Sequence, residues 1–232
     1  MTPTRVKLCG VTTEDDARAC ADAGAWAIGL ILSPMGPRAL DAARAERVRR
    51  AIPPGVLAVG VVVNEPPARA AELARALGLD LVQLHGDEPP ETLGALPVPA
   101  IRAFAIDPAS PRAPAPARLA AFATAYAALV DARSGGSGRT FPWDVLDDPA
   151  FRAALPGGRL VLAGGLDPTN VAAAVRRVRP FAVDVASGIE REPGKKDRAR
   201  IAAFVREVAR ADAELATSHT PLAVSERKEH AP

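Results

Sequence analysis

Aromatic residues are scarce in this sequence, and neither sign of charge is in clear excess. Aromatic side chains make up 4% of the 232 residues, and 29 lysines and arginines against 27 aspartates and glutamates give a net charge of +2. Proteins that bind nucleic acids rely on clustered cations for the phosphates and on aromatic rings for base stacking. We therefore expect no nucleic-acid partner.

Cysteine is nearly absent as well. Cys9 and Cys20 are the two cysteines; they are spaced too widely for a CxxC motif, and no histidine stands beside either. This pattern predicts neither a zinc site nor a disulfide framework, and we expect no metal and no cofactor. Cys20 lies in an alanine-rich helical stretch and is interpreted as a packing residue.

Long apolar runs are also missing. No stretch approaches the ~20 apolar residues that span a bilayer, and the first residues, MTPTRVKLCGVTTEDD, lack the apolar segment of a secretion signal. We expect a cytoplasmic protein with no membrane partner. Its 48% of hydrophobic side chains suffices for a large core.

What the sequence does contain is a regular alternation of short β-rich runs with longer helical patterns. The predicted strands are residues 5–9, 26–32, 56–63, 81–85, 98–106, 126–131, 159–163 and 181–185. Eight βα units predict an α/β protein with a single (β/α)8 TIM barrel. The alternative, an open Rossmann sheet, lacks its GxGxxG motif after the first strand.

The barrel domain is predicted over residues 1–212, with a proline-rich exposed loop at 107–118 and a last helix near 196–212. Residues 213–232 mix polar residues with prolines and show no apolar period. They are predicted to form a disordered tail.

Alternation along each strand predicts which side chains point into the barrel. The inward polar residues are Lys7, Cys9, Gln83, His85, Asp131 and Asp184, with Arg102 and Asn64 as weaker candidates. Most lie near the C-terminal ends of their strands, where barrel enzymes form their active sites. Ionisable groups that face an interior are costly unless they are paired or used, so this cluster predicts a site.

Each of these residues also has a purely structural interpretation. Cys9 can be a small buried hydrophobe, and His85 can be a hydrogen-bonded core residue. Lys7 and Asp184 can pair across the floor of the barrel, and Asp131 can cap the loop that follows it. The presence of all of them at one end favours a functional site.

Glycines after the last two strands predict a phosphate site. The loops LAGGLDPTN and VASGIEREPGKKD follow strands seven and eight, where (β/α)8 barrels commonly bind phosphate. Backbone N–H groups in such loops can approach an anion closely. The candidates are Gly164, Gly165, Ser187 and Gly188. The GGSG segment at 135–138 is predicted to be a flexible lid beside Asp131.

The order and spacing of these motifs resemble the phosphoribosylanthranilate isomerase family of tryptophan biosynthesis. The matching segments are VKLCGVTTEDDA, VGVVVNE, VQLHGDE, LVDARSGGSGRTFPW, LVLAGGLDPTNV and FAVDVASGIEREPGKKD, within about residues 5–205. The resemblance implies a TIM barrel that converts N-(5-phosphoribosyl)anthranilate into 1-(o-carboxyphenylamino)-1-deoxyribulose 5-phosphate by an Amadori rearrangement. The partner is then a small phosphosugar substrate, and the protein a monomer or homodimer.

The resemblance also implies individual roles. It makes Cys9 the general base and Asp131 the general acid. It makes Arg38 the partner of the anthranilate carboxylate, for which a guanidinium fork is suited. His85 and Asp184 are further substrate-binding candidates.

This chemistry sets requirements for both catalytic groups. Asp131 must enter the reaction protonated, because it gives a proton to the ring oxygen as the sugar opens. Cys9 must act as a thiolate on the C2 proton, and we expect Lys7, on the same strand face, to lower its pKa below about 8.5. His85 is an alternative base, and the resemblance favours Cys9.

Two departures from the family pattern concern the substrate contacts: Ala39 follows the arginine and Pro142 precedes the tryptophan of the sixth loop. Two other functions are possible for such a barrel. A sugar-phosphate isomerase of histidine biosynthesis would need a paired-aspartate mouth, which the cysteine at the end of the first strand disfavours. A non-catalytic phosphosugar-binding protein would have no use for both an acid and a base.

Overall fold

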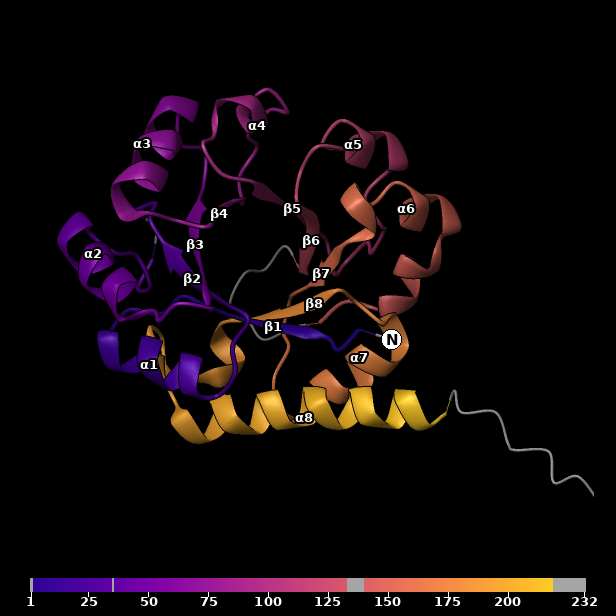
Figure 1. Cartoon of the computed structure of the whole chain (residues 1–232). Coiled ribbons are helices and arrows are strands. Elements are labelled where there is room, and N and C mark those ends of the chain that lie inside the picture. The colour runs from indigo at the N-terminus through magenta and orange to yellow at the C-terminus, as the bar shows by residue number, and fades with distance from the viewer. Residues whose placement is uncertain (1, 35, 133–139, 219–232) are drawn as a thin grey trace, which may run out of the picture.

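Eight parallel strands form a closed barrel that is surrounded by helices (Figure 1). The computed structural model describes residues 2–34, 36–132 and 140–218, so the predicted lid at 135–138 lies outside the described residues. The barrel strands are β1 (Arg5–Cys9), β2 (Ala27–Ile31), β3 (Leu57–Val62), β4 (Leu81–Leu84), β5 (Ala100–Ile106), β6 (Ala127–Ala132), β7 (Leu160–Leu162) and β8 (Ala182–Val185). The (β/α)8 TIM barrel predicted from the sequence is confirmed.

Helices follow the strands and cover the outside of the barrel (Figure 1). They are α1 (Glu14–Asp22), α2 (Ala42–Ala51), α3 (Pro67–Leu77), α4 (Thr92–Ala95), α5 (Pro116–Ala120), α6 (Pro149–Ala153), α7 (Val171–Val178) and α8 (Arg198–Thr217), with short 3-10 helices η1 (Trp143–Asp147), η2 (Pro156–Gly158) and η3 (Ser187–Ile189). A hairpin of β9 (Glu190–Glu192) and β10 (Lys195–Lys196) precedes α8. The sequence patterns did not predict this hairpin.

Strand alternation divides the buried apolar residues into two layers. The inner layer fills the barrel and includes Ala27, Val59, Ile101 and Leu129. The outer layer lies between strands and helices and includes Leu8, Val82, Val183 and Phe204. The predicted directions of the side chains on β1, β4, β6 and β8 agree with this division.

Three aromatic rings pack together at the N-terminal ends of the strands. Trp26, Tyr126 and Phe181 directly precede β2, β6 and β8, and the Trp26 ring centroid lies 6.3 Å from that of Tyr126 and 5.6 Å from that of Phe181. The guanidinium of Arg5 lies over the Phe181 ring. This packing fills one end of the barrel and leaves the opposite end, formed by the βα loops, for a ligand.

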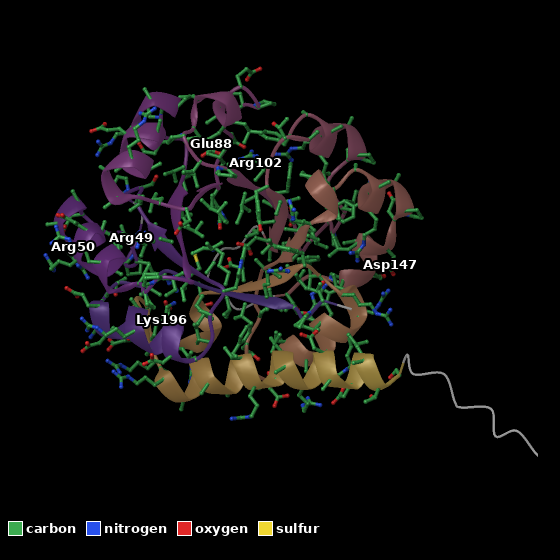
Figure 2. The ribbon with its side chains drawn as sticks, in the orientation of Figure 1. Arg49, Arg50, Glu88, Arg102, Asp147 and Lys196 are labelled. Carbon is green, nitrogen blue, oxygen red and sulfur yellow. The ribbon has the colours of Figure 1, made fainter. Side chains whose placement is uncertain are left out.

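The prediction that Arg102 points into the barrel was wrong. Its neighbours Ile101 and Ala103 belong to the inner layer, so Arg102 faces the helices, with its guanidinium 4.9 Å from the Phe122 ring centroid. There it forms a buried ion pair with Glu88, at 2.7 Å between Nη1 and Oε2 (Figure 2). The Glu88 carboxylate offsets the cost of burying the Arg102 cation between the strands and the helices.

The last helix was also predicted too early in the chain. Lys196 belongs to β10, and α8 begins after the N-cap Asp197, whose carboxylate accepts from Arg200 N. The helix continues to Thr217 because Leu215 packs into the outer layer. None of the helices in the described residues, α8 included, is long and apolar enough to cross a membrane.

Candidate active site

A cavity of about 310 Å³ opens at the C-terminal ends of the barrel strands. The residues of this cavity that the sequence singled out are Cys9, Arg38, Gln83, His85, Asp131, Gly164, Gly165, Asp184 and Ser187. Ile31, Val61, Val63 and Leu166 supply apolar lining. The structure therefore brings together in one cavity the predicted base, the predicted acid and most of the predicted phosphate loops.

Cys9 is the last residue of β1 and lies at the cavity with little exposure. Gly29 on the neighbouring strand makes room for it, because a Cβ at this position would lie 2.6 Å from Cys9 Sγ and 3.1 Å from Lys7 Nζ. The sequence analysis missed Gly29. A glycine within a predicted strand is the signal that could have found it.

The prediction that Lys7 brings the pKa of Cys9 below its ordinary value was wrong for the free protein. Burial raises the pKa of the thiol and outweighs the charges of Lys7 and Lys196, which lower it. Asp184 weakens the influence of Lys7, because its Oδ1 lies 2.8 Å from Lys7 Nζ and its own charge raises the pKa of Cys9. The effect of desolvation on the pKa of Cys9 is thus larger than that of Lys7, whose charge is already paired with Asp184.

Lys7 and Asp184 form the ion pair across the barrel floor that was one interpretation of the sequence. Lys7 is fully buried on β1, and β8 pairs with β1 so that Lys7 stands opposite Asp184. Burial opposes the charged ammonium, but the negative charges of Asp184 and Cys9 raise the pKa of Lys7 above its ordinary value. Asp184 also lines the cavity, so it can serve the ion pair and a ligand together.

His85 stands between Gln83 and Asp131. Its Nδ1 lies 2.7 Å from Gln83 Nε2, and its Nε2 lies 3.6 Å from Asp131 Oδ2. The side chains of His85 and Asp131 are 33% and 21% exposed, so both can reach a ligand. Asn64 lies in the loop after β3, where its Oδ1 accepts a hydrogen bond from Asp87 N at 2.6 Å.

The loop after β7 has the geometry of an anion site. Gly164 and Gly165 have φ of +91° and +66°, a conformation that favours glycine. In the described part of the chain, neither of their N–H groups donates a hydrogen bond. A Cβ at Gly164 would lie 3.0 Å from Asp131 Oδ1, so the loop passes directly beside the predicted acid.

The two predicted phosphate loops also contact each other. Ser187 lines the cavity, whereas Gly188 is not among its lining residues. A Cβ at Gly188 would lie 2.0 Å from Leu166 O. Gly188 therefore permits the close approach of the loop after β8 to the loop after β7.

The sequence analysis missed Glu190 and Lys196, which contact Arg38 and the end of the Cys9 strand. Arg38 donates from Nε and Nη2 to the two carboxylate oxygens of Glu190, at 2.8 and 2.7 Å. Buried Lys196 donates to Glu190 Oε1 at 2.9 Å and to the carbonyl oxygens of Cys9 and Ala186 at 2.6 and 3.0 Å. The charged motif EREPGKKD was visible in the sequence, but its partners were not.

This network connects Arg38 to the end of the strand that carries Cys9. Burial opposes the Glu190 carboxylate, but the hydrogen bond from Arg38 and the charge of Lys196 hold its pKa below the ordinary value. The hydrogen bond to Glu190 in turn raises the pKa of Arg38. Arg38 reaches the cavity with its side chain 17% exposed.

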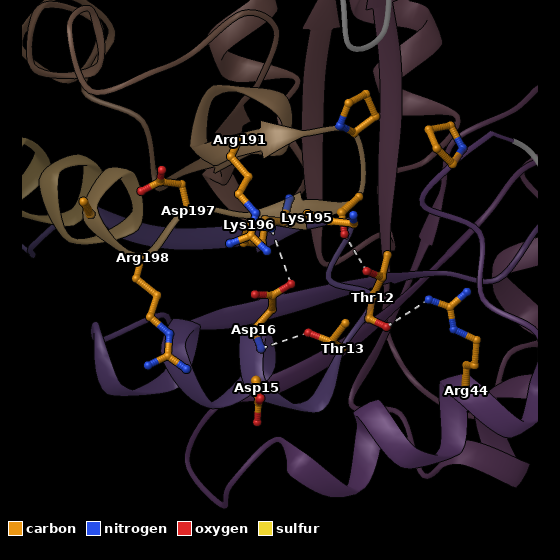
Figure 3. Close-up of a pocket in the computed structure, with 14 residues that line it drawn as sticks. Thr12, Thr13, Asp15, Asp16, Arg44, Arg191, Lys195, Lys196, Asp197 and Arg198 are labelled. Atoms are coloured by element: carbon orange, nitrogen blue, oxygen red, sulfur yellow. Dashed lines mark hydrogen bonds between the residues drawn. The ribbon is translucent and has the colours of Figure 1, made fainter.

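A larger hollow of about 760 Å³ lies where the β9–β10 hairpin meets α1 (Figure 3). Thr12 Oγ1 donates to Gly194 O at 2.5 Å, and Lys196 N donates to Asp16 Oδ2 at 3.4 Å. Among the described residues that line it, none is a predicted site residue. The described residues also contain no group of three or more potential metal ligands.

Comparisons with known proteins identify the family. Residues 6–207 match the family model for N-(5'-phosphoribosyl)anthranilate (PRA) isomerase. The N-(5'-phosphoribosyl)anthranilate isomerase of Geobacter sulfurreducens is 43% identical over 207 residues, which are 87% of this chain and 97% of the relative.

Solved structures give the same result. The phosphoribosyl anthranilate isomerase of Thermus thermophilus superposes with a TM-score of 0.80 at 34% identity, covering 89% of this chain and 99% of that one. A phosphoribosyl anthranilate isomerase in complex with reduced 1-(o-carboxyphenylamino)-1-deoxyribulose 5-phosphate has a TM-score of 0.78 at 35% identity and covers 89% and 98%. The chain belongs to the N-(5'-phosphoribosyl)anthranilate isomerase family.

Proposed function

We propose that this isomerase carries out the Amadori rearrangement of N-(5-phosphoribosyl)anthranilate with Asp131 as general acid and Cys9 as general base. The observation that supports these roles is that both side chains line the same cavity of about 310 Å³, next to glycine loops suited to a phosphate. The cavity is small, so a pentose held there lies within reach of both groups.

In the first step, Asp131 gives its proton to the furanose ring oxygen while the C1–O bond breaks. The electron pair of that bond leaves with the oxygen, and the anilino nitrogen stabilises C1 as a protonated Schiff base. Asp131 becomes a carboxylate. Its carboxylate lies beside Gly164, in the loop proposed to bind the phosphate, and beside His85, which follows β4.

In the second step, the Cys9 thiolate removes the proton from C2, and the electrons of the C2–H bond neutralise the Schiff base to give an enolamine. Tautomerisation to the C2 ketone completes the aldose-to-ketose change. Because burial raises the pKa of the thiol in the free protein, the thiolate must form when substrate is bound. The cationic Schiff base next to Cys9 favours this deprotonation.

Substrate recognition is assigned to the remaining cavity residues. The N–H groups of Gly164 and Gly165 and the loop at Ser187 bind the phosphate, and Arg38 binds the anthranilate carboxylate. Since two nitrogens of Arg38 already contact Glu190, its other N–H groups are the ones available to this carboxylate.

The test is the isomerase assay on the purified chain and two variants. Cys9→Ala and Asp131→Asn should each lower kcat at least ~100-fold, the usual scale of general acid–base catalysis. Retention of activity by both variants would reject these roles. The control is Cys20→Ala, which changes a buried thiol in α1 that does not line the cavity and should leave kcat unchanged.

The proposal also covers location and assembly. We assign the enzyme to the cytoplasm, as a monomer or homodimer that takes a small phosphosugar and no nucleic acid. Cell fractionation and the mass in solution, measured by sedimentation equilibrium, test these assignments.

A further inference from the structure

Gln83 lies on the inner face of β4, His85 directly follows that strand two residues later, and their side chains meet. Gln83 Nε2 lies 2.7 Å from His85 Nδ1, with Gln83 buried and His85 reaching the cavity. An amide nitrogen carries two N–H groups and can only donate. His85 Nδ1 is therefore the acceptor, and a neutral His85 carries its ring proton on Nε2.

The protonated nitrogen is the one on the side of the catalytic acid, because Nε2 is 3.6 Å from Asp131 Oδ2. In this tautomer neither ring nitrogen has a free lone pair: Nδ1 accepts from Gln83, and Nε2 holds the proton. His85 then cannot accept the C2 proton. It can donate a hydrogen bond to the carboxylate that Asp131 becomes after protonating the ring oxygen.

We propose that Gln83 is a positioning residue that fixes His85 as the Nε2–H tautomer, which removes His85 as a competing base and directs a hydrogen-bond donor at Asp131. The proposal rests on the roles assigned above to Cys9 and Asp131. In residues 2–34, 36–132 and 140–218, Gln83 Oε1 is buried and has no hydrogen-bond partner. A buried amide with one end unpaired is unfavourable, and its paired end is the one that faces His85.

Other titratable or charged groups surround His85 and must be counted in any effect of pH. Cys9, Arg38 and Asp184 line the same cavity, and Asp87 and Arg118 line an adjoining hollow that also contains His85 and Asp131. The protonation of the His85 ring must therefore be measured directly, because the pH dependence of a rate would include the effects of all of these groups.

Nitrogen-15 NMR of the full chain labelled at histidine provides this measurement. The chain has three histidines, and His219→Gln and His230→Gln identify the signals that do not come from His85. At a pH where the ring is neutral, unmodified protein should show the Nε2–H tautomer for His85. An Nδ1–H tautomer in the unmodified protein would overturn the proposal, whatever the variants do.

Two substitutions then test whether Gln83 is the cause. Gln83→Met keeps the length of the side chain but removes the donor, and it should convert the single tautomer into a mixture. Gln83→Glu replaces the donor with an acceptor and should give Nδ1–H or the imidazolium. The control is Leu81→Met, also on the inner face of β4 and one strand repeat away from Gln83.

The kinetic expectation is a fall in kcat with little change in KM for Gln83→Met, smaller than the ~100-fold loss expected on removal of the acid. The pH profile of kcat should shift in Gln83→Met and not in Leu81→Met. Unchanged tautomer and pH profile in Gln83→Met would contradict the proposal. If Cys9→Ala and Asp131→Asn were active while the tautomer was as expected, the catalytic roles would fail and the Gln83–His85 geometry would stand.

Discussion

Gly29 lies so close to Cys9 that a single methyl group would displace the thiol. A Cβ at residue 29 would be 2.6 Å from Sγ and 3.1 Å from Cys9 Cα. The Cys9 side chain, from the neighbouring strand β1, therefore occupies the space that a side chain at residue 29 of β2 would fill. This contact sets the position of the proposed base.

Gly29→Ala should therefore lower activity while the fold is retained. Overpacking of this kind costs about 1–3 kcal/mol of stability, and misplacing a reacting group by ~1 Å can cost ~100-fold in rate. Steady-state kinetics and thermal unfolding measure the two effects. The matched control is Gly94→Ala in α4, where an added Cβ has no heavy atom within 4 Å. Equal activity of the two variants would show that the thiol position does not depend on Gly29.

Alkaline pH should destabilise the protein through its buried thiols. Burial raises the pKa of Cys20 to about 12, whereas an unfolded cysteine titrates near 8.5. Above pH ~8.5 the unfolded state loses this proton and the folded state keeps it, so the free energy of unfolding falls with pH, by up to about 1.4 kcal/mol per pH unit for one thiol. Below pH ~8.5 both states are protonated and the thiol adds no pH dependence.

Denaturant unfolding between pH 8 and pH 10.5 checks this expectation, with Cys20→Ala as the comparison. The variant should show a shallower fall than the unmodified chain. The same slope in both would mean that Cys20 ionises alike in the folded and unfolded states.

Glu190→Gln should weaken the contacts that hold the Arg38 side chain in place and should lower the stability of the protein. The amide cannot neutralise the two cations that contact Glu190, Arg38 and the fully buried Lys196. Breaking a buried ion pair by removing one partner typically costs about 3–5 kcal/mol. We expect a higher KM, because Arg38 is the proposed partner of the anthranilate carboxylate.

Glu192→Gln in the same hairpin is the control for this variant. Glu192 pairs with Lys195, but both side chains are more than half exposed, at 54% and 57%. Such surface pairs contribute about 0–1 kcal/mol. A stability loss as small for Glu190→Gln as for Glu192→Gln would show that the buried network is not required.

Glu88→Gln should destabilise the fold with little direct effect on the chemistry. Glu88 pairs with Arg102, with both side chains 2% exposed, and it accepts hydrogen bonds from the N–H groups of Asn64 and Gly86. The amide would leave Arg102 as an unpaired buried cation, at a cost of about 3 kcal/mol or more. Chemical unfolding measures the loss, and exposed Glu91→Gln is the control.

A double variant distinguishes the ion pair from general damage to the loop. Arg102→Met added to Glu88→Gln should recover part of the lost stability, because it removes the unpaired charge. Additive losses in the double variant would mean that the two side chains do not act as a pair.

The sequence predicted much of the site because strand alternation is a local property. A period of two residues sends Cys9 and Asp131 to the inner face of their strands, whatever the rest of the fold does. Parallel strands in a barrel place their C-terminal ends at one mouth, so the same reasoning brings the glycine loops to that mouth. For Arg102 the alternation rule holds, and the error lay in assigning a charged residue to the interior without considering a buried partner.

The sequence by itself determined the order of the eight βα units, the direction of most strand side chains and the motifs of the candidate cavity, because these depend on residues near one another in the chain. The tertiary structure alone decided which charges meet: Lys7 and Asp184 are 177 residues apart, and Arg38 and Glu190 are 152 apart. It also decided the pKa of Cys9, which burial raises by more than the charge of Lys7 lowers it. Electrostatic effects depend on distance and desolvation in three dimensions, and no local pattern of residues specifies either.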